Sequence, residues 1–184
     1  VARRELSTNV GRPAACIADD MADAAERLMA QVGVSARQMR GVGVGSPGIV
    51  DERSGVVLYS NNFGWKDVPL AEMIRRRLRL PLAIANDAHC AALGEMEAGA
   101  GRDYRNLILI TLGTGVGGGI VLNRRLFTGA NEGGGIIGHM CVVHGGELCT
   151  CGRRGCLEAY ASATALIREM ARAAQQKPDS ILAR

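Results

Sequence analysis

The sequence contains few aromatic residues and no long apolar run. Only 3% of its residues are Phe, Trp or Tyr, so a ring platform for stacking single-stranded nucleic acid is not expected. No apolar run reaches the roughly 18 residues of a membrane span, and the first residues lack the pattern of a secretory signal. We therefore expect a cytoplasmic protein, in which the six cysteines are better suited to metal binding than to disulfides.

Internal repeats and low-complexity linkers are also missing. The 184 residues are 47% hydrophobic and 22% charged, which is enough apolar material for a core and excludes a disordered chain. The net charge of +4 comes from scattered arginines rather than from one dense basic tract. The densest group, within residues 75–79, is expected to be a solvated helix face. The length allows one domain or two small ones.

Hydrophobic spacing predicts alternating helices and strands. Apolar residues recur at helical spacing in three long segments and in a shorter one, whereas strands are indicated by β-branched and apolar runs next to Gly or Pro. The expected helices are 17–32, 68–80, 91–100 and 156–174. The expected strands are one within 41–51, which runs into a loop, one at 81–87 and two within 105–127. A Gly-rich turn should join the last two strands, and a further hairpin is expected at Asn123 and Arg124. This order indicates an α/β or mixed α+β architecture.

One histidine and three cysteines have the spacing of a metal site. His139 precedes a C-x-C-x4-C loop made of Cys149, Cys151 and Cys156, with glycines between them. Thiolates and imidazole suit Zn²⁺, and four protein ligands indicate a structural metal rather than a catalytic one. The alternatives are unconnected reduced cysteines, or His144 as the fourth ligand. The remaining cysteines, Cys16, Cys90 and Cys141, are expected to be buried small side chains. His89 is expected to be a surface or core histidine.

Two further segments carry groups suited to phosphate and hydroxyl chemistry. Residues 111–119, TLGTGVGGG, place uncovered N–H groups at a turn between strands, where a phosphate could bind, although a ligand-free turn explains the same pattern. No GK[ST] follows, so this is not a P-loop. Asn86 and Asp87 lie where a strand meets a helix. Asp87 is therefore either a functional carboxylate or a helix N-cap.

In combination these segments resemble the ROK family of sugar kinases and sugar-responsive repressors. The resemblance extends from Gly41 to Ala174, through GVGSPGIVD, NNFGW, ANDAHCAALGE, TLGTGVGGG, IGHM and CTCGRRGCLEAYAS in that order. It implies the actin-like (ribonuclease H-like) ATPase fold, with residues 1–104 in an N-terminal sugar-binding domain and 105–184 at the start of the nucleotide and zinc domain. The family's first phosphate loop, DxGGT, is not found, so the chain is expected to be partial.

The resemblance also implies a role for each site residue. Asp87 corresponds to the base that takes the proton of the sugar 6-hydroxyl as it attacks ATP, bound with Mg²⁺. The residues that resemble sugar contacts are Gly48, Asn61, Asn86, Asp87, His139 and Glu158, and those that resemble phosphate contacts are Gly113, Thr114 and Gly115. His139 would bind zinc through one ring nitrogen and a sugar hydroxyl through the other. The implied protein is a glucokinase that forms a homodimer or homotetramer.

The sequence departs from the family pattern beside the zinc histidine. Family kinases have a glutamate three residues before it, whereas Ile136 stands here. An apolar side chain would leave a sugar hydroxyl unpaired, at a cost of roughly 1 to 3 kcal/mol. Ala85 is a second, lesser change, and Glu132 lies four residues away from the family position. Weaker binding, another sugar or loss of catalysis follow as hypotheses.

Three alternatives to a glucokinase remain open at this point. A sugar-sensing repressor would keep the fold and the zinc but not the chemistry, and Ile136 favours it while Asp87 does not. A kinase for fructose, N-acetylmannosamine or N-acetylglucosamine, or a catalytically impaired homologue, would need only a changed pocket. A zinc-stabilised binding module that uses the cysteine loop is the third, unrelated alternative.

Overall fold

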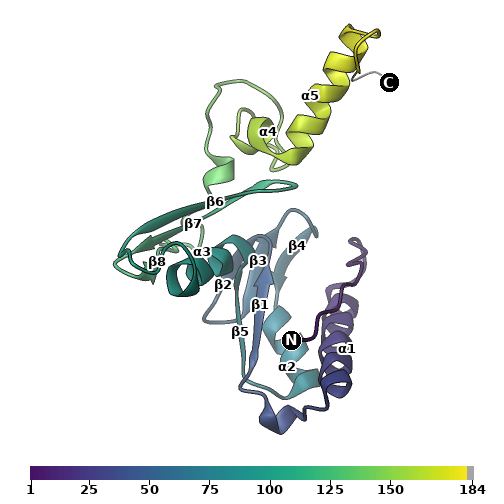
Figure 1. The fold of residues 1–184 in the computed structure, drawn as a ribbon, viewed down its shortest axis with the longest axis vertical. Coiled ribbons are helices and arrows are strands. Elements are labelled where there is room, and N and C mark those ends of the chain that lie inside the picture. Colours follow the sequence, from purple (N-terminus) through teal and green to yellow (C-terminus); the bar gives the residue numbers. More distant parts are fainter. Residues whose placement is uncertain (182–184) are drawn as a thin grey trace. The chain divides into compact units, whose positions relative to one another are not determined.

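The computed structural model describes residues 1–181 and divides the chain into two compact units, Val1–Cys90 and Ala91–Arg184. Both units combine strands with helices, which confirms the expected mixed architecture (Figure 1). Within residues 1–181 no helix has the length and apolarity needed to cross a membrane. The predicted domain boundary at residue 104 concerns the whole protein and stays a prediction.

The first unit contains two small sheets and two long helices. Its elements are α1 (Ala14–Val32), η1 (Ala36–Gln38), β1 (Val42–Ser46), β2 (Ile49–Asp51), β3 (Val56–Ser60), β4 (Trp65–Val68), α2 (Leu70–Leu78) and β5 (Leu82–Asn86), followed by the start of α3 (Asp87–Ala98). Strand β1 pairs with β5 in parallel, so that Ser46 lies opposite Asn86 at the carboxyl ends of both strands. The antiparallel sheet β2-β3-β4 follows in chain order.

One apolar core joins these elements. Its buried members come from α1, from both sheets and from α2. Among its members Leu70 and Ile74 of α2 are the largest side chains that are almost fully buried. The core residues of this unit are Ile17, Ala18, Ala22, Val44, Val50, Val57, Trp65, Leu70, Ala71, Ile74, Leu78, Leu80 and Ile84.

Local backbone signals set the ends of the helices. Helix α1 ends at Gly33, whose φ of 68° is a left-handed conformation that glycine adopts without strain. Helix α2 is shorter than the expected 68–80, because Val68 belongs to β4 and Arg79 adopts a left-handed conformation. Helix α3 begins at Asp87, before the expected residue 91.

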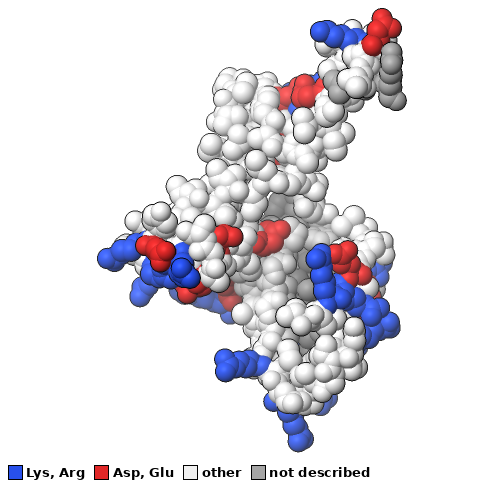
Figure 2. All heavy atoms as spheres, in the orientation of Figure 1, with Lys and Arg blue, Asp and Glu red and all other residues white. Residues whose placement is uncertain are grey.

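Charges of both signs lie together on the surface of the first unit. The guanidinium of Arg77 in α2 donates to Asp19 (2.8 Å) and Asp23 (2.6 Å) of α1 and thereby joins the two helices. These side chains are exposed, so water and salt screen both pairs and each contributes little to stability. Basic and acidic side chains are also intermingled on the face shown in Figure 2.

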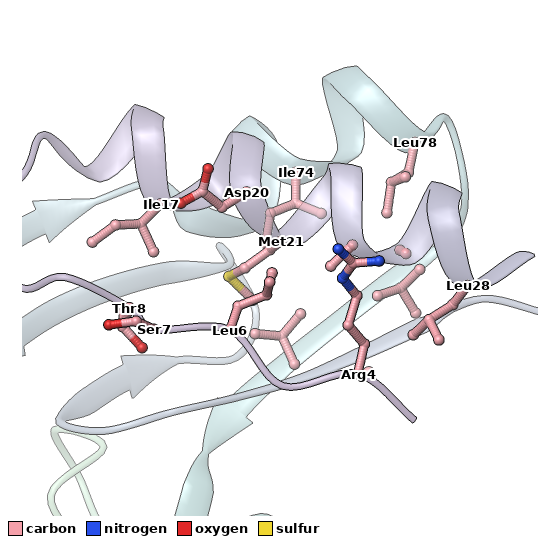
Figure 3. A pocket seen from close by; sticks show the side chains of 15 residues that line it. Arg4, Leu6, Ser7, Thr8, Ile17, Asp20, Met21, Leu28, Ile74 and Leu78 are labelled. Carbon is pink, nitrogen blue, oxygen red and sulfur yellow. The ribbon is translucent and has the colours of Figure 1, made fainter. Parts of the chain in front are cut away.

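A pocket of about 520 Å³ lies in the first unit and borders β1. Its lining comes from the N-terminal segment, α1, β1 and α2, and Figure 3 shows mostly apolar side chains such as Leu6, Met21 and Ile74 around it. None of the predicted site residues lines it.

The second unit is built on an antiparallel meander, β6 (Leu107–Leu112), β7 (Val116–Leu122) and β8 (Arg125–Leu126). The Gly-rich turn between β6 and β7 and the hairpin at Asn123 and Arg124 are both where the sequence predicts them. Ala92 and Met96 of α3 pack on Val121 of β7. The remaining elements are η2 (Ile137–His139), α4 (Glu158–Ala161) and α5 (Ala163–Gln176).

The single helix predicted over 156–174 is wrong. Ser162 has an extended backbone (φ −82°, ψ 162°) and separates α4 from α5. Its hydroxyl accepts the N–H of Ala165 at 3.0 Å and so caps α5. The predicted helix is therefore two helices that meet at Ser162.

Candidate functional site

Asn86 and Asp87 lie at the junction of β5 and α3 and have different local roles. The Oδ1 atom of Asn86 accepts the N–H groups of Ala88 (2.9 Å) and His89 (3.1 Å). Asn86 is therefore the N-cap of α3, and the alternative in which Asp87 fills that position is wrong. Asp87 is exposed, and within residues 1–181 its carboxylate accepts only the N–H of Ala88, through Oδ1. The Oδ2 atom remains available to a ligand.

The loop of Gly48 contacts this junction directly. The Nδ2 group of Asn86 donates to the carbonyl of Gly48 at 2.9 Å. Gly48 has a φ of 111°, and a Cβ atom at this position would lie 2.2 Å from the carbonyl oxygen of Tyr59, so no other residue fits. The structure thus brings Gly48 and Asn86 together. Asn61 is exposed and follows β3, the strand against which Gly48 packs.

The turn Gly113–Gly115 joins β6 to β7 in the second unit. Among residues 1–181 the N–H groups of Thr114 and Gly115 make no hydrogen bond, as the Gly-rich pattern predicts. Glu158 lies beside the turn, because its Oε2 atom accepts the N–H of Val116 at 3.0 Å. A Cβ atom on Gly115 would lie 2.3 Å from the same oxygen. The arrangement offers backbone donors to an anion.

The ligand atoms of His139, Cys149, Cys151 and Cys156 all lie within 4.8 Å of one another. The Nδ1 atom of His139 is 3.6 Å from the Cys149 sulfur, and the sulfurs of Cys151 and Cys156 are 3.7 Å apart. No other such group occurs among residues 1–181, and exposed His144 does not belong to it. The structure therefore assembles the four predicted ligands into one group that could hold a metal.

Backbone bonds and one arginine fix the cysteine loop. The N–H of Cys149 donates to the carbonyl of Arg153 (2.8 Å), and the Arg153 guanidinium donates to the carbonyl of His139 (2.8 Å). Burial and the neighbouring thiols raise the pKa of Cys156 to about 12. Burial also acts to raise the pKa of Cys151, but hydrogen bonds with Arg153, Cys149 and Cys156 together outweigh it and lower this pKa. A divalent cation would relieve the repulsion between clustered thiolates.

The cysteines outside this group are not buried, contrary to the expectation. The three side chains are exposed: Cys16, Cys90 and Cys141. That expectation rested on the average preference of free cysteine for interiors, and these helix and loop positions face outward instead. His89 is buried and is thus a core histidine.

Ile136 lies directly before η2, in a segment that contacts β7. A Cβ atom on Gly118 of β7 would lie 2.9 Å from the side chain of Ile137, which shows how closely the segment packs. Ile136 itself is half-buried and offers no hydrogen-bonding group, and Glu132 is also half-buried. Three contacts were not expected from the sequence, because Thr and Arg side chains have no characteristic spacing. They join Thr150 to Glu158, Arg153 to the carbonyl of His139, and Thr164 to the carbonyl of Thr114.

The ROK family model matches residues 2–183. The chain belongs to the ROK family. It is 41% identical to a glucokinase of Halalkalibacterium halodurans over 180 residues, which cover 97% of this chain and 54% of that protein. A xylose repressor of Bacillus subtilis is 33% identical over 83% of this chain and 39% of its own length. The predicted membership and the resemblance to glucokinases are thus confirmed.

Solved structures show the same fold. The ROK family glucokinase of Streptomyces griseus, solved with glucose and AMPPNP, matches with a TM-score of 0.76 and 38% identity, over 88% of this chain and 51% of that one. The predicted α/β fold of the ROK sugar kinases is confirmed. The chain spans about half the length of the glucokinases that it matches.

Proposed function

We propose that the whole protein is an ATP-dependent hexose kinase that converts glucose to glucose 6-phosphate. The observation that carries this proposal is the position of Asp87, whose carboxylate is exposed at the end of β5 while Asn86 supplies the helix cap. A carboxylate whose oxygens accept the N–H groups of a helix start would be a poor proton acceptor. The Oδ2 atom of Asp87 is instead available to accept a proton. Similarity to glucokinases over almost the whole chain supports the same reaction.

In this reaction Asp87 accepts the proton of the sugar 6-hydroxyl while the hydroxyl oxygen bonds to the γ-phosphorus of ATP. The bond between that phosphorus and the bridging oxygen breaks, and ADP leaves. The Mg²⁺ that accompanies ATP neutralises phosphate charge.

The other predicted site residues receive their proposed roles from the resemblance to the family. Asn86 uses one N–H to hold the carbonyl of Gly48, and its second N–H is left for a sugar hydroxyl. Asn61 and Glu158 supply further polar groups to the sugar. The N–H groups of Thr114 and Gly115, together with Gly113, bind the phosphates of ATP.

A coupled assay that follows ADP release by the whole protein tests the proposal. Glucose should be the best substrate in a panel with fructose, N-acetylglucosamine and N-acetylmannosamine. Absence of sugar-dependent ADP release with every member of the panel would contradict the kinase function. A preference for another sugar would keep the function and change the substrate.

We also propose that His139, Cys149, Cys151 and Cys156 hold one structural Zn²⁺. In a tetrahedral site with Zn–S bonds of about 2.3 Å, two sulfurs are about 3.8 Å apart, and the observed separation of Cys151 and Cys156 is 3.7 Å. Nδ1 of His139 faces Cys149, so Nδ1 would be the ligand atom. Nε2 then carries the proton and can donate to a sugar hydroxyl, in an orientation that the metal fixes.

Replacing Ile136 by Glu should lower the KM for glucose. Ile136 stands where family kinases have a glutamate, and a carboxylate there would accept a hydroxyl now left without a protein partner. The expected gain is about ten- to a hundredfold in kcat/KM, since a hydrogen bond to a charged group is worth about 1.5 to 3 kcal/mol. Coupled assays of wild type, Ile136→Glu and the apolar control Ile136→Leu measure it. Equal values for the three proteins would show that residue 136 does not contact the sugar.

A sugar-sensing repressor is the second candidate, and Ile136 favours it together with the 33% identity to a xylose repressor. The retained Asp87 argues against it, because a sensor needs no base. The two functions separate in one experiment on the whole protein. Sugar that raises its melting temperature without any ADP release supports the repressor, whereas sugar-dependent ADP release supports the kinase.

A further inference from the structure

The turn Gly113–Gly115 is held from the side by the segment that follows the cysteine loop. The N–H of Ala163 donates to the carbonyl of Gly113 at 2.8 Å, and the hydroxyl of Thr164 donates to the carbonyl of Thr114 at 2.8 Å. Glu158 accepts the N–H of Val116, at the first residue of β7, at 3.0 Å. We call Glu158, Ala163 and Thr164 the α4–α5 clamp.

The clamp leaves the turn with satisfied carbonyls and open N–H groups. Two successive carbonyls, those of Gly113 and Thr114, receive donors from α5. The N–H groups of Thr114 and Gly115 have no partner among residues 1–181. A turn whose carbonyl groups are fixed in this way presents its donors in one orientation, which is what binding of a phosphate needs.

The geometry of α5 explains how the clamp is kept rigid. The first N–H groups of a helix have no intrahelical partner, and α5 directs that of Ala163 onto Gly113. The Ser162 hydroxyl accepts the N–H of Ala165 in the first turn of helix α5, and both residues are buried. The hydroxyl of Thr164 is thus carried by a capped helix start.

Glu158 connects the clamp to the cysteine loop. Its Oε1 atom accepts the hydroxyl of Thr150 at 2.9 Å and lies 3.6 Å from the sulfur of Cys149, while its Oε2 atom holds Val116. One carboxylate therefore touches both the loop with the predicted zinc ligands and the strand that follows the turn.

We propose that Thr164 is a positioning residue for the nucleotide: through the carbonyl of Thr114, it orients the Gly113–Gly115 turn toward the phosphates of ATP. This inference rests on the proposed kinase function and adds a residue that touches neither sugar nor phosphate. Among residues 1–181 the Thr164 hydroxyl donates only to the carbonyl of Thr114, so we expect its loss to affect binding of the nucleotide and not of the sugar.

The test compares Thr164→Val, which keeps the shape and removes the donor, with Thr164→Ser, which keeps the donor, in the whole protein. Loss of one hydrogen bond predicts a rise of about three- to tenfold in the KM for ATP for Thr164→Val. The KM for glucose and the zinc content should stay at wild-type values, and Thr164→Ser should restore the KM for ATP. Thr164→Ala replaces Thr164→Val if the latter does not fold.

Calorimetric titration with ATP in the absence of sugar gives a second measurement, which does not depend on turnover. An unchanged KM and Kd for ATP in Thr164→Val overturns the proposal, and so does an equal rise in the KM for glucose. If wild type binds ATP but transfers no phosphate, the kinase function fails while the ATP titration still decides the role of Thr164. If wild type binds no ATP, both proposals fail.

Discussion

Replacing Asp87 by Asn should lower kcat by a factor of about 10² to 10⁴, the usual contribution of a general base. The amide keeps the size of the side chain and cannot accept the hydroxyl proton. Asn86 would still cap α3 and hold Gly48, since neither bond involves the Asp87 side chain. The KM for glucose should therefore change much less than kcat. Steady-state kinetics of the whole protein, with ADP release as readout, measures both.

The matched control is Asp103→Asn, which neutralises another exposed carboxylate, in the connection between α3 and β6. It should retain wild-type kcat, and both variants should keep the wild-type melting temperature. A kcat for Asp87→Asn within twofold of wild type would show that another group takes the proton. A large fall in melting temperature would instead assign Asp87 a structural role.

Local patterns predicted most elements of this fold, and the errors have physical causes. Helix α1 and strands β1, β5, β6 and β7 lie where spacing and Gly or Pro signals indicate them. Strands β3 and β4 were not expected, and only their antiparallel pairing in the sheet β2-β3-β4 defines them. The break at Ser162 depends on the bond from Ala163 to the carbonyl of Gly113, which is distant in sequence.

The sequence predicted those parts of the candidate site whose residue types have a characteristic chemistry, such as metal binding. Histidine and cysteine at metal-ligand spacing allowed the group of His139 and the three cysteines to be predicted, and the structure brings all four together. The roles of Asn86 and Asp87 could not be separated by sequence, because either side chain caps a helix well. The contact between Thr164 and Thr114 joins residues 50 positions apart, and no local signal marks it.

Replacing Cys156 by Ser should abolish zinc binding and strongly destabilise the second unit. Cys156 is buried and lies 3.7 Å from the sulfur of Cys151. The cluster around it is small, consisting of Cys149, Cys156 and Ala159 with Cys151 packed against them, so the metal must supply much of the stability of the loop. We expect a loss on the order of 5 kcal/mol in the free energy of unfolding, by analogy with structural zinc sites. Metal analysis and urea unfolding of the whole protein measure the two effects.

Cys16→Ser is the control, since Cys16 is exposed on α1 in the other unit. It should keep one zinc per chain and wild-type stability. Chelation of wild type should reproduce the Cys156→Ser effect and should become easier as the pH falls, because protons compete with the metal for thiolates and imidazole. Because Glu158 touches both Thr150 and Val116, zinc loss should also weaken ATP binding. Stability that is unaffected by chelation would mean that the four side chains do not hold a structural metal.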